Sequence, residues 1–165
     1  MLPLLTVGVI FTAPFAEAYS PGDLMIVGLD SDPNPDGFSF VTWVDLPVNE
    51  TILFFDAEYD GGGNGTGEGS GGGLYGGLRE VEWTNSTGAT VPAGTVISIT
   101  DLTNTSSSTS LGAVTGGFGL TNTGEQIFIA DGSFTASGAN DFFVGTLIFG
   151  FDYDGTGSWG EGSES

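Results

Sequence analysis

Residues 22–46 read GDLMIVGLDSDPNPDGFSFVTWVDL, and this stretch decides the fold class. Two segments rich in β-forming residues, 23–29 and 38–46, flank a loop in which oxygen-bearing side chains recur at every second position. Segment 23–29 is mostly apolar, which is typical of a central strand buried on both faces. Segment 38–46 alternates between two faces, which predicts a strand with one face in the core.

The alternation in 38–46 separates two sets of side chains. One face is predicted to carry Phe38, Phe40, Thr42, Val44 and Leu46, and the other Ser39, Val41, Trp43 and Asp45. Trp43 is expected in the core because its strand has many apolar partners, and Trp83 is expected there for the same reason.

Short β-type segments continue along the chain, separated by Gly, Pro, Asn and Asp. We expect them at residues 51–57, 78–84, 95–100, 118–120, 125–130 and 141–153. The first is expected to pair with 38–46 as a meander, and the strand 125–130 to end at the turn dipeptide Asp131-Gly132. Seven to eight strands without helical periodicity predict an all-β, antiparallel β-sandwich.

Glycine dominates residues 60–77, which contain GGGNGTGEGSGGG at 61–73. Ordering such a segment costs conformational entropy that its small side chains cannot offset, so a long flexible loop is expected. A phosphate-binding loop is disfavoured because no Gly-Lys-Ser/Thr sequence follows.

The N-terminus has the pattern of a secretory signal peptide. Residues 4–15 are largely apolar and Ala16-Glu17-Ala18 fits a small-x-small cleavage site, although no basic residue precedes them. The predicted organisation is a signal peptide at 1–18, a sandwich domain at 19–153 and a Gly/Ser/Glu-rich tail or linker at 154–165. The mature chain is expected outside the cell or at its surface, and without a membrane span, since no apolar run approaches ~20 residues.

The charge balance is strongly acidic, with 21 Asp and Glu against Arg79 alone and a net charge of -20. Nucleic acids and anionic membrane surfaces are therefore disfavoured as partners, because binding them needs Lys and Arg. Two explanations of the acidity stay open: solubility in salty surroundings and specific cation binding.

Missing residue types exclude most catalytic machinery. Without His or Cys the chain has no Ser-His-Asp or Cys-His system and no ordinary zinc site, and without Lys it has no Schiff base. A pair of carboxylates of the glycosidase type is left, with Glu80 and Glu82 on one strand face as an example.

The loop between the first two strands is the sharpest signal for a ligand. Its alternating oxygen donors suit Ca²⁺, which takes six to eight oxygen ligands, and the predicted metal ligands are Asp30, Asp32, Asn34 and Asp36. The loop is not an EF-hand, because Pro35 stands where Gly is needed and Val41 where the twelfth-position Glu belongs. The alternative is a proline-stiffened acidic turn in water. Weaker cation candidates are Asp56, Glu58, Asp60, Asp152 and Asp154.

Other side chains suggest surface recognition. Tyr59, Tyr75 and Trp159 lie in Gly-rich segments and are expected at the surface, where they could form a platform for sugar rings. Asn-x-Ser/Thr triplets, a weak signal in a chain rich in these residues, occur at Asn49, Asn64, Asn85 and Asn104.

The order of several short phrases resembles the lamin-tail-like domains of secreted bacterial proteins. These phrases are GDLMIVGLDSDPNPDGFSFVTWVDLP, TILFFDAEYDGGG, EVEWT, VPAGTVISI and LTNTGEQIFIADG, which span residues 22–132. The resemblance implies an immunoglobulin-like sandwich that serves as an extracellular binding or structural module, with no catalytic residues to carry over. The glycine insertion and the Phe-rich segment after Gly138 depart from it.

Together these observations predict a secreted, acidic, non-catalytic structural or adhesion module with a calcium-binding loop. A carbohydrate-binding module is the first alternative and a carboxylate-dependent glycoside hydrolase the second. The expected partner is an extracellular protein or glycan, and self-assembly through exposed edge strands is a further expectation.

Overall fold

The computed structural model of the chain describes residues 19–31, 35–56, 58–60, 73–76, 80–102, 107–118, 120, 126–137 and 140–153. The predicted signal peptide, residues 61–72 of the predicted glycine loop and the predicted tail lie outside the described residues. No helix within the described part is long and apolar enough to cross a membrane.

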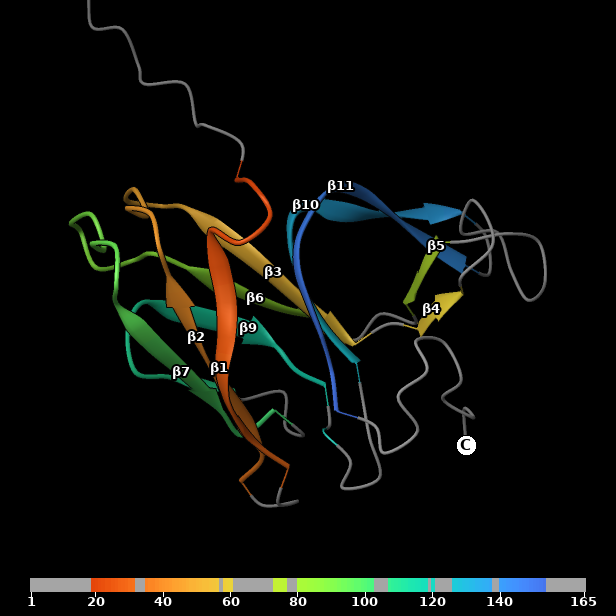
Figure 1. The fold of residues 1–165 in the computed structure, drawn as a ribbon, viewed down its shortest axis with the longest axis horizontal. Helices are drawn as coiled ribbons and strands as arrows, with labels where there is room; N and C mark the ends of the chain where they lie inside the picture. Colours follow the sequence, from red (N-terminus) through yellow and green to blue (C-terminus); the bar gives the residue numbers. More distant parts are fainter. Residues whose placement is uncertain are drawn as a thin grey trace, which may run out of the picture.

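Within the described residues, eleven strands form two sheets in which every pairing is antiparallel (Figure 1). The four-stranded sheet has the order β1-β2-β7-β8, with β1 at Leu24–Asp30, β2 at Gly37–Thr42, β7 at Val96–Thr100 and β8 at Ser108–Thr109. The seven-stranded sheet has the order β4-β5-β11-β10-β3-β6-β9, with β3 at Thr51–Asp56, β4 at Glu58–Asp60, β5 at Gly73–Gly76, β6 at Glu80–Thr84, β9 at Ala113–Gly116, β10 at Gln126–Ser137 and β11 at Asn140–Asp152. The predicted all-β sandwich is confirmed. Seven strands have at least five residues, and the short β4, β5, β8 and β9 add to them.

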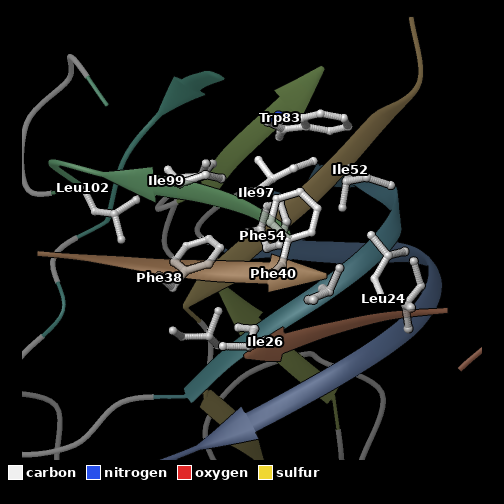
Figure 2. Close-up of a cluster of buried hydrophobic side chains, with 14 of the residues drawn as sticks. Leu24, Ile26, Phe38, Phe40, Ile52, Phe54, Trp83, Ile97, Ile99 and Leu102 are labelled. Carbon is white, nitrogen blue, oxygen red and sulfur yellow. The ribbon is translucent and has the colours of Figure 1, made fainter. Parts of the chain in front are cut away.

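Aromatic rings from both sheets meet in the core between them. The ring of Phe40 on β2 lies 4.8 Å from Phe54 on β3 and 5.7 Å, edge-on, from Trp83 on β6. Phe38 contacts the same Phe54 at 4.9 Å between ring centroids. Figure 2 shows these rings grouped with the aliphatic side chains around them, among which Ile97 comes from β7. Burial of large aromatic side chains is a major stabilising contribution, so these contacts hold the two sheets together.

β1 does not lie at the centre of its sheet, so the prediction of a strand buried on both faces is wrong. Leu24 and Ile26 point into the core, whereas Met25 and Val27 on the other face are exposed. The strand is at the margin of the four-stranded sheet, and no layer in the described part of the chain covers its second face. An apolar run indicates that a strand has at least one buried face, but it does not show whether the second face is covered.

Residues 43–50 carry the chain from one sheet to the other. β3 pairs with β6 and β10 and not with β2, so the predicted meander is wrong. Leu46 and Val91 form an isolated bridge beside this crossing, with two backbone hydrogen bonds of 2.8 and 2.9 Å. A short connection fits a crossing between sheets as well as a hairpin, and the pairing partners decide between them.

The buried side chain of Asn85 ties this crossing to the rest of the fold. Its Nδ2 group donates to the carbonyl oxygens of Leu46, Pro47 and Ala89 at 3.0, 2.8 and 2.9 Å. Its Oδ1 atom accepts hydrogen bonds from the backbone N–H and the hydroxyl of Thr87 at 3.2 and 2.7 Å. Every polar atom of this amide is therefore used inside the protein, and the triplet Asn85-Ser86-Thr87 has a structural explanation.

β10 runs straight through Asp131-Gly132, so the predicted turn is wrong. Asp131 pairs with Thr146 and Gly132 with Gly145, and the hairpin with β11 continues to the pair Ser137↔Asn140. An Asp-Gly dipeptide favours a turn only where the chain must reverse. Here β11 is long enough to supply partners beyond it.

Contacts between the sheets close both sides of the sandwich. On one side β1 lies beside β11, and the backbone N–H of Gly22 donates to the carbonyl oxygen of Ile148 at 3.1 Å. On the other side β8 lies beside β9, and the Ser107 hydroxyl donates to the Gly116 carbonyl at 2.7 Å. Gly116 has φ +84°, and a Cβ atom there would lie 2.1 Å from the carbonyl oxygen of Glu80, so only glycine fits.

Candidate functional site

The loop between β1 and β2 contains the predicted calcium ligands. Asp32 and Asn34 lie outside the described residues. Asp30, at the end of β1, is exposed, whereas Asp36 is completely buried. The Asp36 Oδ2 atom accepts a hydrogen bond from the backbone N–H of Leu120 at 2.8 Å, and its carbonyl oxygen accepts one from Asp101 at 2.8 Å. Asp36 therefore anchors the loop to distant parts of the chain.

The described residues contain no group of three or more Asp, Glu, His or Cys that could hold a metal ion. Only Asp30 and Asp36 of the four predicted ligands are described, so the calcium site stays a prediction. Asp154 lies outside the described residues, and Asp152 ends β11 opposite Gln126. Asp56 ends β3 and Glu58 and Asp60 bound β4, where only their backbone positions are described.

Phe118 and Leu120 were expected in a short strand but lie outside the strands. Both side chains are buried in the main core, and the Phe118 ring stacks on Phe38 at 6.0 Å between centroids. Phe118 and Leu120 therefore pack in the core without belonging to a strand, and the hydrogen bond from the Leu120 N–H to Asp36 satisfies one backbone donor.

A cluster of acidic groups surrounds Tyr19, which the sequence did not indicate. Burial raises the pKa of the Tyr19 phenol well above its usual value, and the charge of Glu50 and a hydrogen bond to that carboxylate raise this pKa further. Burial also raises the pKa of Glu50, against the effect of the hydrogen bond from Tyr19, and the charge of Asp131 adds to the rise. The hydrogen bond between Tyr19 and Glu50 ties the first described residue to the start of β3, while Asp131 of β10 adds a like charge near both groups. Glu80 and Glu82, the predicted example of a carboxylate pair, are both exposed.

The two tryptophans on predicted strands have opposite environments. Trp83 is buried as predicted, and its Nε1 atom donates to the carbonyl oxygen of Leu111 at 2.7 Å. Trp43 is 57 % exposed, so its predicted place in the core is wrong. Its neighbours on the same face, Ser39 and Asp45, are polar, and this was the signal in the sequence that the face points outward.

The predicted sugar platform of Tyr59, Tyr75 and Trp159 is only partly described. Tyr59 lies in β4 opposite Leu74 of β5, and Tyr75 lies opposite Glu58. The ends of the predicted glycine loop therefore form a pair of short strands. The placement of the two tyrosine side chains stays a prediction, and Trp159 lies outside the described residues.

The surface of the four-stranded sheet that points away from the core is apolar at one end. Met25, Val41 and Val96 form one row across β1, β2 and β7, because Met25 pairs with Val41 and Val41 with Val96. Four side chains are well exposed on this surface: Trp43 at 57 %, Val96 at 55 %, Val27 at 49 % and Met25 at 37 %. Val41, in the middle of the row, is buried outside the main core.

Hydroxyl groups occupy the next row of the same surface. Ser39 pairs with Ser98 across β2 and β7, and their Oγ atoms are hydrogen-bonded at 2.8 Å. We define the outer face as the seven residues Met25, Val27, Ser39, Val41, Trp43, Val96 and Ser98. These seven side chains are uncharged, and Asp45, which is exposed and follows Trp43 by two residues, borders them.

Comparison with protein-family models, curated proteins and solved structures finds no match for this chain. The resemblance to lamin-tail-like domains therefore stays a prediction from the sequence. Among the described residues, the outer face contains four of the six exposed large hydrophobic side chains. Exposed aromatic and aliphatic side chains that are contiguous on one face are typical of surfaces that bind another protein or a ligand.

Proposed function

We propose that the protein is a secreted, non-catalytic extracellular module with an adhesive or structural role, and that the outer face is its contact surface. The observation that supports this proposal is the exposed group of Trp43, Val96, Val27 and Met25 on one sheet face. Removing such apolar surface from water on contact with a partner is favourable. The lack of His, Lys and Cys supports a role in binding rather than catalysis.

The mature chain, residues 19–165, is expected to adsorb to at least one extracellular matrix material. The measurement is depletion from solution by insoluble cellulose, insoluble chitin and collagen-coated beads at physiological salt, with an assay for released sugar or peptide. Trp43→Ser should lose most of the adsorption, because the exposed indole contributes the largest apolar area on the face.

Val48→Ser is the matched control, because Val48 is also exposed but lies outside the outer face. This variant should adsorb like the parent chain. Adsorption of the parent chain to none of the three materials would contradict the proposed contact surface. Adsorption of Trp43→Ser equal to that of the parent chain would also contradict it. Release of soluble product would contradict the non-catalytic role.

A calcium-stiffened loop is part of the same proposal. Ca²⁺ that binds only the folded chain raises its stability, by about 2.7 kcal/mol when the free ion is at 100 times its Kd. We expect added CaCl₂ to raise the melting temperature of the parent chain, and Asp32→Ala to abolish the rise while Glu82→Gln, an exposed carboxylate elsewhere, keeps it. The same melting temperature with and without CaCl₂, together with parent-like melting of Asp32→Ala, would remove the calcium site from the proposal.

A further inference from the structure

We propose that the outer face binds a neutral polysaccharide, with one sugar ring stacked on the indole of Trp43. This inference rests on the proposed adhesive function and names its ligand. It does not use the predicted platform of Tyr59, Tyr75 and Trp159, because it depends on a tryptophan that the sequence placed in the core.

Hydrogen bonds hold the backbone at Trp43 and at the residue before it. Its own N–H donates to the carbonyl oxygen of Asp23 at 2.7 Å. The backbone N–H of the preceding residue, Thr42, donates to the carbonyl oxygen of Thr95 at 3.2 Å. The Thr42 carbonyl oxygen accepts a hydrogen bond from the N–H of Gly94 at 2.6 Å. An aromatic side chain on a backbone held in this way loses little conformational entropy when a ligand packs on it.

The rest of the outer face suits a ring that is apolar on one side and rich in hydroxyls at its edge. Met25, Val41 and Val96 form an apolar row beside Trp43, which matches the C–H groups of a sugar ring. Ser39 and Ser98 follow one row further along, about 7 Å away at the usual rise of a strand, and their hydroxyls can exchange hydrogen bonds with sugar hydroxyls.

Charge decides among the partners that an apolar surface can take. The chain carries a net charge of -20, so an anionic glycan or a second copy of the protein is repelled. A second copy is disfavoured by area as well, because a stable dimer buries about 800 Å² and 20–30 residues on each partner, and the outer face has seven residues. A basic protein would find a carboxylate only at the margin of the outer face, at Asp45, and none among the seven side chains themselves. A neutral polysaccharide meets none of these obstacles.

Affinity electrophoresis in gels that contain a soluble polysaccharide tests the ligand directly. Hydroxyethyl cellulose, galactomannan and mixed-linkage β-glucan are the neutral probes, and polygalacturonate is the anionic one. We expect at least one neutral probe to retard the parent chain and polygalacturonate to leave its mobility unchanged. Trp43→Ala should weaken the retardation at least about tenfold, Trp43→Phe should recover part of it, and Val48→Ala should bind like the parent chain.

The inference is overturned if none of the three neutral probes retards the parent chain. It is also overturned if the parent chain and Trp43→Ala are retarded equally. Retardation by polygalacturonate alone also overturns it. Adsorption to collagen-coated beads that depends on Trp43, without retardation by any neutral probe, would disprove the polysaccharide and leave the adhesive function standing. Thermal melting of Trp43→Ala and Trp43→Phe like the parent chain shows that a loss of binding is not a loss of folding, since Trp43 is mostly exposed.

Discussion

Replacing Asn85 with alanine is expected to lower the free energy of unfolding by about 3 kcal/mol or more. The substitution removes the buried amide that donates to the carbonyl oxygens of Leu46, Pro47 and Ala89. It also removes the acceptor of two hydrogen bonds from Thr87. Each lost hydrogen bond costs roughly 0.5–1.5 kcal/mol net, and here several are lost together. Urea unfolding of parent and variant measures the difference.

Two further substitutions separate the hydrogen bonds of Asn85 from its volume. Asn85→Asp keeps the size of the side chain but brings a carboxylate toward the three carbonyl oxygens, so it should destabilise at least as much as alanine at neutral pH. Ser86→Ala, at the exposed neighbouring position, should change the unfolding free energy by less than about 0.5 kcal/mol. If Asn85→Ala were as mild as Ser86→Ala, the crossing between the sheets would not depend on this amide.

Replacing Phe54 with alanine is expected to lower the free energy of unfolding by about 3–5 kcal/mol, the usual range for a buried Phe. Phe54 is fully buried, and its ring contacts Phe38 and Phe40 of the opposite sheet at 4.9 and 4.8 Å. The substitution removes the transfer free energy of the ring and leaves a cavity between the sheets. Chemical denaturation followed by tryptophan fluorescence is a suitable measurement, because Trp83 packs against Phe40.

Graded and surface substitutions serve as controls for Phe54. Phe54→Leu keeps most of the buried apolar volume and should cost clearly less than alanine. Val48→Ala removes apolar atoms from an exposed position and should have little effect. An effect of Phe54→Ala below about 1 kcal/mol would show that these ring contacts do not hold the sheets together.

The alternation in residues 38–46 was sufficient to predict a strand and to place Phe38 and Phe40 in the core. It was not sufficient to place Trp43. A period of two separates the faces of a strand but does not show whether the second face is covered. The prediction for Trp43 rested on the apolar partners along its strand, whereas Ser39 and Asp45 on the same face are polar.

Long-range pairing explains the other differences between prediction and structure. The turn signal of Asp131-Gly132 is local, whereas the continuation of β10 depends on partners in residues 140–146. The crossing to the second sheet depends on Asn85, which lies 39 residues after Leu46. Nothing in the residues near either position indicates such distant partners.

The candidate sites were predictable to different degrees. The spacing from Asp30 to Asp36 showed that the loop is acidic and that its side chains could converge. It could not show that Asp36 is buried and binds the backbone of Leu120, 84 residues away. The outer face was missed because it is assembled from three strands, β1, β2 and β7, and only the register between them brings its residues together.

The contact between β1 and β11 bears on how the molecule responds to mechanical load. The N–H of Gly22, near the first described residue, is bonded to the carbonyl oxygen of Ile148, near the last. A pulling force applied through the two ends of the described domain would load this hydrogen bond, and the one between Tyr19 and Glu50, before the ring contacts of Phe38, Phe40 and Phe54. Rupture would then begin by peeling the terminal strands apart, and most of the sandwich would stay intact while the tether lengthened.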